Sequence, residues 1–226
     1  MFIGAGTAAV VGDGAGLNGI TAIAFAHGLT IMVFAFAYGS LSGGHMNPAV
    51  TVGVLAAGAI RLGDAIGYII SQLVGGIAGA LLLRTVLGGV ATGLGTPHLA
   101  HDLVLGTITV TITPEAGFAI ETILAFFLVT VVLSTAVAGR AGNLAPFAIG
   151  MTLTLNIMMG GPLTGAPFNP ARALGPMVAT GNFTEVWLYM IAPLVGAVMA
   201  TLVHVGLKWV AGEEPTIGHA VATPAE

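Results

Sequence analysis

The stretches HMNPAV at residues 45–50 and PFNPAR at residues 167–172 decide how this chain folds, because both carry Asn-Pro-Ala and they lie 122 residues apart. Each follows a turn-like segment, SGGH in one case and GAP in the other. Asn is a favoured helix N-cap, and Pro is favoured at the first helical position. The two stretches therefore predict short helices over 47–59 and 169–179. A helix of roughly ten residues extends about 15 Å, half of a bilayer's hydrocarbon core.

The composition around these stretches is that of a membrane protein. Charged residues make up 6 % of the 226 residues and hydrophobic residues 56 %, whereas an average soluble domain carries about 25 % charge. The mean hydropathy is +1.02. These values exclude a soluble globule and a disordered chain. A net charge of −4 without a basic patch excludes a nucleic-acid binder, and the lack of Cys excludes disulfides and thiol chemistry.

Apolar runs long enough to cross a bilayer flank both motifs. A spanning helix needs about 20 mostly apolar residues. Runs of that kind, the fourth somewhat short, are found at 19–38, 64–87, 116–138, 144–159 and 186–209. Residues 1–11 are apolar but too few to cross. An odd number of spans in each half inverts the second half, which predicts an all-α inverted repeat whose half-helices meet at mid-membrane.

The repeat also divides the chain. We expect one membrane domain over 1–226, with a first repeat at 1–87 and a second at 114–211. Residues 88–113 form the extracellular link between them, and 212–226 form a polar cytoplasmic tail.

Two helix N-termini that meet in the membrane create a specific electrostatic environment. Each carries about half a positive charge, so the pair repels cations, including hydronium. The amides of Asn47 and Asn169 are expected to face the lumen and to donate to a passing solute. The irregular backbone before each Asn is tolerated at this depth only where it lines a water-filled path. The carbonyls expected to line that path belong to Gly43, Gly44, His45, Gly165 and Ala166.

Three segments make the sequence similar to the aquaporin (major intrinsic protein) family: SGGHMNPAVT at 42–51, QLVG at 72–75 and GGPLTGAPFNPAR at 160–172. The resemblance covers essentially the whole chain. It implies six spans, two re-entrant half-helices, a pore in each subunit, a homotetramer and passive transport. The paired motifs that it assigns to the pore are Asn47, Pro48, Ala49, Asn169, Pro170 and Ala171.

The resemblance also implies an outer constriction, whose residues are counted from the two motifs: His27, Ile157, Ala166 and Arg172. Water-selective members usually place Phe first and His second, and glycerol facilitators place Asp after the Arg, where this chain has Ala173. The set here is most similar to plant tonoplast-type aquaporins. Because Ile157 offers no hydrogen bond, we expect a channel for water and small neutral solutes, ammonia first, then urea or glycerol.

Some further charged or titratable residues have expected places. By resemblance, Glu121 accepts hydrogen bonds from backbone N–H groups of the re-entrant loops, a structural role rather than proton relay. His98 and His101 lie in the link, where a gating role and plain solvent exposure both remain open. Arg61, Arg140 and Lys208 share one side of alternating spans and Arg84 lies on the other. This distribution predicts cytoplasmic termini in a cell membrane.

Other classes of function require features that the sequence offers weakly or lacks. A membrane enzyme would need a nucleophile, base or metal ligands in a cluster; three Asp (13, 64 and 102) and scattered His give no such motif, so no catalysis, metal or cofactor is expected. A proton- or ion-coupled transporter would need intramembrane acids, for which only Glu121 qualifies. A non-conducting relative also remains open.

The first span is unusual in one respect. The position that corresponds to Glu121 in the first repeat falls before Met1, where the family normally has an intramembrane Glu. We therefore expect a first helix that lacks roughly 10 to 20 residues of a complete span. A late start and a tolerated short helix both remain open.

Overall fold

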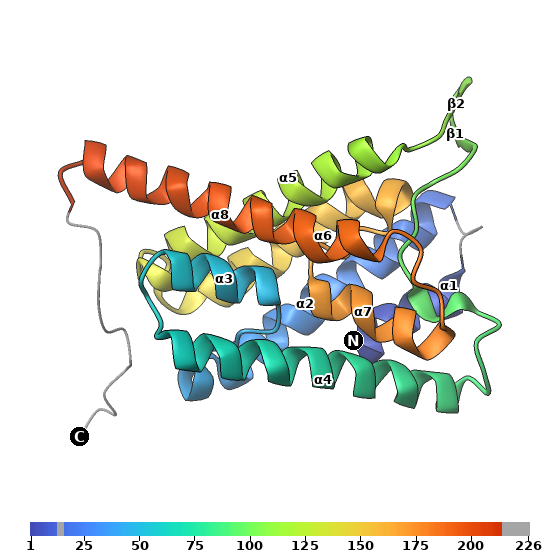
Figure 1. Ribbon diagram of the computed structural model, residues 1–226, viewed down its shortest axis with the longest axis horizontal. Helices are drawn as coiled ribbons and strands as arrows, with labels where there is room; N and C mark the ends of the chain where they lie inside the picture. Colours follow the sequence, from blue (N-terminus) through green and yellow to red (C-terminus); the bar gives the residue numbers. More distant parts are fainter. Residues whose placement is uncertain (13–15, 214–226) are drawn as a thin grey trace.

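Helices account for most of the chain in the computed structural model, which describes residues 1–12 and 16–213. The bundle that they form is elongated, and its long helices run along the long axis (Figure 1). Most of the predicted tail, 214–226, lies outside the described residues, as does Asp13. The helices are α1 (Phe2–Val11), α2 (Gly16–Ser42), α3 (Pro48–Ala56), α4 (Leu62–Val86), α5 (Pro114–Val132), α6 (Ala145–Thr164), α7 (Pro170–Thr180) and α8 (Val186–Val210).

The predicted spans are confirmed. Of the helices in the described part of the chain, five are long and apolar enough to cross a membrane: α2, α4, α5 with its π-helical continuation η2 (Leu133–Val137), α6 and α8. Helix α1 is apolar but has ten residues, as the sequence predicts.

The predicted end of the fourth span was wrong. The apolar run stops at residue 159, but α6 continues to Thr164, with Pro162 inside its last turn. The helix ends where Gly165 adopts a left-handed conformation (φ 76°) and its N–H bonds the Gly161 carbonyl. Glycine takes this conformation without steric cost, so Gly165 rather than the preceding Gly and Pro residues stops the helix.

The half-helices α3 and α7 lie inside the bundle, and each packs against the last helix of the other repeat (Figure 1). Helix α3 packs against α8, where the Thr201 hydroxyl donates to the Gly53 carbonyl at 3.0 Å. Helix α7 packs against α4 through Gly76 and Gly175, whose backbones are so close that neither position has room for a Cβ. This exchange of partners is the geometry of an inverted repeat.

Close helix contacts are made by small residues elsewhere in the bundle as well. Helices α2 and α6 cross at Gly28 and Gly150, and a Cβ at Gly150 would lie 2.6 Å from the Gly28 carbonyl oxygen. Helices α5 and α8 meet at Gly196, which lies against the Thr122 backbone. Glycine allows backbones to approach this closely in membranes, where van der Waals packing drives helix association.

The link between the repeats contains structure that the sequence analysis did not predict. It has a 3₁₀ turn, η1 (Gly93–Gly95), and an antiparallel hairpin of β1 (Leu103–Leu105) and β2 (Ile108–Val110), in which Leu103 pairs with Val110. A second 3₁₀ turn, η3 (Gly142–Leu144), precedes α6. The hairpin projects from one end of the bundle (Figure 1).

Candidate functional site

The two Asn residues of the repeated motif join the half-helices at their N-termini. The Asn47 side-chain oxygen accepts from the Ala49 N–H at 2.9 Å, and that of Asn169 accepts from the Ala171 N–H at 3.0 Å, so each Asn caps its own helix. Each amide nitrogen reaches across to the other loop: Asn47 Nδ2 donates to the Phe168 carbonyl at 3.0 Å. Asn169 Nδ2 donates to the Met46 carbonyl at 2.9 Å. One N–H of each amide is thereby used. Asn169 also lines the cavity described below, whereas Asn47 is buried and is not in its lining.

Glu121 of α5 holds the loop before the second motif. Its carboxylate is buried and accepts from the Phe168 backbone N–H at 2.7 Å and from the Thr164 hydroxyl at 2.6 Å. The loop needs such support because Ala166 (φ 40°) and Phe168 (φ 28°) have positive φ angles that cost L-residues energy. The Thr164 hydroxyl also accepts from the Ala166 N–H at 3.1 Å.

Gln72 of α4 supports the loop before the first motif. Its amide nitrogen donates to the His45 carbonyl at 2.9 Å and to the Thr51 hydroxyl at 3.0 Å. In this loop the positive φ angles belong to Gly43 (82°) and Gly44 (64°), which carry no side-chain penalty. The sequence analysis included Gln72 in a family segment but gave it no role, because only the tertiary structure brings it to His45.

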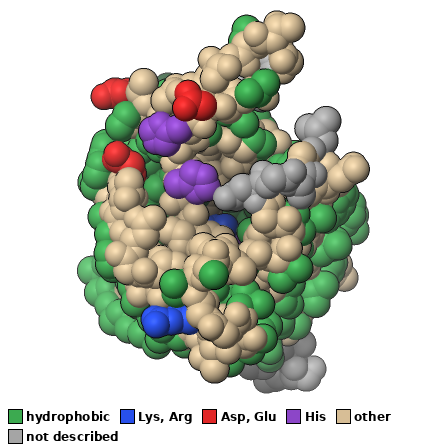
Figure 2. All heavy atoms as spheres, turned by 90° about the vertical axis from the view of Figure 1, so that its right-hand side faces the viewer, with side chains coloured by type: hydrophobic (Ala, Val, Ile, Leu, Met, Phe, Trp, Pro, Cys, Tyr) green, Lys and Arg blue, Asp and Glu red, His purple; other side chains and the backbone are tan. Residues whose placement is uncertain are grey.

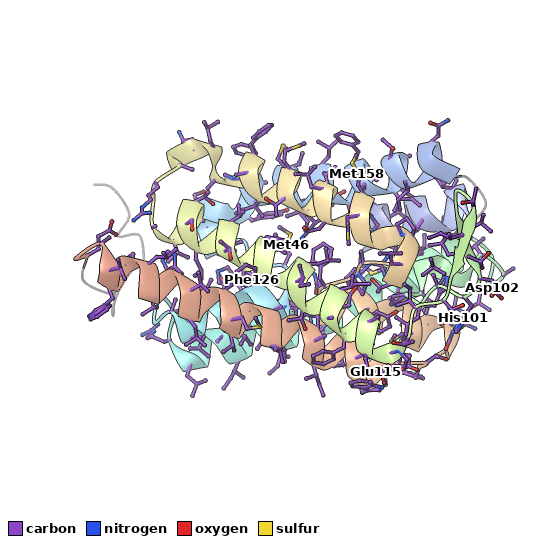
Figure 3. All side chains as sticks on the ribbon, turned by 90° about the horizontal axis from the view of Figure 1, so that it is seen from above. Met46, His101, Asp102, Glu115, Phe126 and Met158 are labelled. Carbon is purple, nitrogen blue, oxygen red and sulfur yellow. The ribbon has the colours of Figure 1, made fainter. Side chains whose placement is uncertain are left out.

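A cavity of about 360 Å³ lies where the half-helices meet. It is lined by residues of α1, α2, α4, α6, α7 and both loops. Its lining includes Gly4, His27, Thr30, His45, Met46, Gln72, Ile157, Ala166, Asn169, Ala171 and Arg172. In the view from above, Met46 lies near the middle of the bundle (Figure 3).

The four residues predicted for the constriction all line this cavity, although they come from three separate segments. Ile157 and Ala166 are buried and offer apolar surface. Arg172 lies about one helical turn after Asn169, and its Nη1 donates to the Gly95 carbonyl of η1 at 2.8 Å. A guanidinium has five N–H donors, so this one bond fixes its position and leaves others for a solute.

His27 lines the cavity and carries a buried hydrogen-bond acceptor beside Gly4. Its Nδ1 lies 2.8 Å from the Ile23 carbonyl oxygen. A carbonyl can only accept, so Nδ1 carries the proton, and in the neutral ring Nε2 has a free lone pair. Nε2 is buried and has no hydrogen-bond partner among the described residues. The cavity is thus bordered by the His27 ring, whose acceptor is turned toward Gly4, and by the donors of Arg172.

The predicted pore-lining carbonyls divide into two groups. His45 and Ala166 line the cavity, whereas Gly43, Gly44 and Gly165 are not in its lining. The His45 carbonyl already accepts a hydrogen bond from Gln72. The imidazole ring of His45 stacks on the Tyr68 ring, with 4.6 Å between the ring centroids. The carbonyls that bond the opposite Asn residues, at Met46 and Phe168, were not predicted.

The link histidines are exposed, and His98 Nδ1 lies 3.4 Å from the Thr96 carbonyl. His101 and Asp102 lie at the end of the bundle near the hairpin (Figure 3). Seen from that end, histidine side chains border a recess in which a basic side chain is visible (Figure 2). Within 1–12 and 16–213, no group of three or more His, Asp or Glu is placed to hold a metal ion.

Comparison with known proteins identifies the family. The family described as Major intrinsic protein matches residues 1–204. The probable aquaporin TIP2-2 of Oryza sativa subsp. japonica is 38 % identical over 213 residues, which cover 90 % of this chain and 80 % of that protein. Nodulin-26 of Glycine max is 38 % identical over 207 residues, 90 % of this chain and 72 % of that protein.

A solved structure shares the fold. The X-ray structure of the aquaglyceroporin from Plasmodium falciparum matches with a TM-score of 0.74, covering 90 % of this chain and 89 % of that chain, at 23 % identity. Together with the match of the family over most of the sequence, this likeness in fold leads to one conclusion: the chain belongs to the major intrinsic protein family.

Proposed function

We propose that this protein is a passive channel for water and small neutral solutes, with ammonia the first of these and urea or glycerol next. The observation that carries the proposal is the cavity at the junction of the half-helices. His27, Ile157, Ala166, Arg172 and Asn169 line it together. A solute there meets donors, an acceptor and apolar surface within one small volume.

The polar groups suit a solute that both donates and accepts hydrogen bonds. Arg172 can donate to a lone pair on the solute, and the carbonyl groups proposed to line the path at His45 and Ala166 can accept hydrogen bonds from it. Water and ammonia meet both conditions. Because Ile157 contributes no polar atom where water-selective relatives usually place His, water has less advantage over ammonia.

Exclusion of protons and cations is proposed to arise at the junction itself. The N-termini of α3 and α7 each present about half a positive charge to the cavity, and Arg172 adds a full charge. Asn169 lines the cavity and can donate its remaining N–H, so a water molecule there is oriented with its oxygen toward it. A water held in this orientation cannot relay a proton along a hydrogen-bonded chain.

Reconstitution in liposomes tests the proposal. We expect the purified protein to accelerate osmotic shrinkage and ammonia entry above the rates of protein-free liposomes, with no dissipation of a pH gradient by protons. The double variant His27→Phe with Ile157→His should keep water permeability and lose ammonia permeability. Water flux at the protein-free rate would refute the channel, and unchanged ammonia flux in the double variant would refute the role of this pair.

The contacts of Glu121 disfavour a proton-coupled transporter. Both carboxylate oxygens accept hydrogen bonds from groups that hold the second loop. Loss of the charge during a transport cycle would weaken both bonds and release a strained loop. The geometry therefore supports a fixed structural acid, and solute flux should follow its gradient without dependence on a pH gradient.

The positions of the basic residues bear on the orientation of the channel in the membrane. Arg61 precedes α4 and Lys208 lies in the last turn of α8, while Arg140 reaches Glu213 just beyond α8 at 2.8 Å. Arg84 lies at the opposite end of α4. Following the rule that positive residues favour the cytoplasmic side, we propose cytoplasmic termini in a cell membrane.

We also propose that the channel assembles as a homotetramer, because α2 and α4 have large exposed apolar faces. Light scattering of the purified protein should give four chains per particle. A monomer under conditions that preserve water permeability would refute the assembly.

A further inference from the structure

The short helix α1 packs against the two elements that carry or contact the polar residues of the constriction, His27 and Arg172. It packs against α2, which carries His27, and against η1, which holds Arg172. Two consecutive small residues, Gly4 and Ala5, make these contacts, and both are buried. The sequence analysis treated this helix only as an incomplete span.

The His27 ring lies flat against the backbone of Gly4. A Cβ built on Gly4 would lie 2.6 Å from Nε2 and 2.7 Å from Cγ of the ring, closer than real Cβ atoms approach other atoms. Any side chain at this position would therefore displace the ring or push α1 away. Gly4 itself is part of the cavity lining, so the ring and the glycine meet at the edge of the cavity.

The His27 ring is held on two sides. Its Nδ1 is anchored to the Ile23 carbonyl at 2.8 Å, which fixes one edge. Gly4 closes one face, and the cavity lies beyond the ring. A methyl group at position 4 would thus turn the ring into the cavity and narrow it.

Ala5, the next residue of α1, contacts the turn that holds Arg172. A Cβ on Gly95 would lie 3.0 Å from the Ala5 carbonyl oxygen and 3.2 Å from the Ala5 Cβ. The Gly95 carbonyl in turn accepts from Arg172 Nη1 at 2.8 Å. Through Ala5, α1 thus supports the turn that positions the guanidinium.

From these contacts we propose that Gly4 and Ala5 of α1 are positioning residues that set the separation of His27 and Arg172, and hence the width and hydrogen-bonding geometry of the constriction. The inference rests on the proposed channel function. It assigns to α1 a part in solute selection, in addition to covering α2.

The test is a double-mutant cycle in liposomes. Gly4→Ala should lower water permeability severalfold and ammonia permeability at least as much, because both pass the displaced ring. In a His27→Ala background, the same substitution should have no further effect. Gly67→Ala is the matched control: Gly67 is also helical, is not in the cavity lining and has no atom within 4 Å of its Cβ position.

Equal losses from Gly4→Ala in both backgrounds, or no loss in either, would overturn the proposal. A structure of the Gly4→Ala variant distinguishes failure of this proposal from failure of the channel function. We expect a rotated His27 ring with α1 in place, and an unmoved ring with a displaced α1 would overturn the proposal whatever the flux. Wild-type flux at the protein-free rate would refute the channel function, and the ring position would still decide the structural inference.

Discussion

Arg172 is the residue whose presence most needs an explanation. A charged side chain at the centre of a membrane helix costs roughly 2.5 to 3.5 kcal/mol on insertion scales. Here the cost is reduced because the guanidinium borders a polar cavity and donates to the Gly95 carbonyl. Since Arg172 also lines the cavity, the proposed function assigns it a role in selection rather than in stability.

Replacing this residue should therefore change selectivity more than folding. For Arg172→Ala we expect urea and glycerol permeability to rise, since the cavity widens, and proton leak to increase, since a full positive charge is lost. Stopped-flow shrinkage and a pH-sensitive dye inside liposomes measure both. Arg84→Ala is the control, because Arg84 donates to the Ala179 carbonyl and is not in the cavity lining. Unchanged solute preference in the Arg172 variant would contradict its place in the constriction.

Glu121 should show the opposite behaviour, a change in stability with little change in selectivity. A Gln amide has one acceptor oxygen and a donor group, so Glu121→Gln cannot accept from both Phe168 N–H and the Thr164 hydroxyl. We expect a loss of about 1–3 kcal/mol, the usual cost of leaving a buried polar group unsatisfied. Thermal unfolding of the purified protein measures this. A variant of full stability that lost pH-dependent transport would instead favour a proton relay.

At the scale of elements, the long apolar runs were sufficient to predict the spans, because every spanning helix must satisfy its own backbone in lipid. The predictions that were wrong or missing concern the end of a helix and the links between helices. The apolar run at 144–159 predicted an early end to α6, but the helix continues to Thr164 and ends where Gly165 takes a left-handed conformation. The hairpin after η1 was missed because its short strands have no long alternating pattern.

The contact between α5 and α8 offers a test of helix packing. A Cβ on Gly196 would collide with the Thr122 carbonyl and lie 2.9 Å from the Phe126 nitrogen, both backbone atoms that cannot move aside. We expect Gly196→Ala to destabilise the protein by about 1–3 kcal/mol, as overpacking typically does. Gly206→Ala on the same helix is the matched control, since no atom lies within 4 Å of its Cβ position. Equal melting temperatures for the two variants would contradict this prediction, because they would mean that α5 and α8 can move apart at little cost.

At the scale of the whole molecule, counting from the two motifs by resemblance to the family named four residues that line the cavity together. That worked because a half-helix fixes Arg172 one turn after Asn169, and long helices fix His27 and Ile157 by register. The sequence could not reveal what holds these groups: Gln72 on the His45 carbonyl, Thr164 on Ala166 and Gly4 behind His27. Each of these contacts joins different elements, and no local pattern marks it.

The absence of Cys from the whole sequence leads to a further prediction. Mercurials that block a pore by capturing a thiol have no target here. We expect water permeability in liposomes to be unchanged by brief exposure to mercuric chloride. Ala166→Cys should introduce a block that a reducing thiol reverses, because Ala166 lines the cavity. A rapid, reversible block of the protein without this substitution would contradict the prediction.

The crossed hydrogen bonds of the two asparagines also constrain how the protein is made. They join residues 121 and 123 positions apart, so each pore loop depends on a carbonyl supplied by the other half. During synthesis the first half reaches the membrane with its Asn47 amide and Met46 carbonyl still without these partners. The final register of the first loop must therefore wait until the second motif has reached the membrane, which makes closure of the pore a late event in the folding of the chain. Two halves expressed as separate chains should each insert but acquire this register only when they meet.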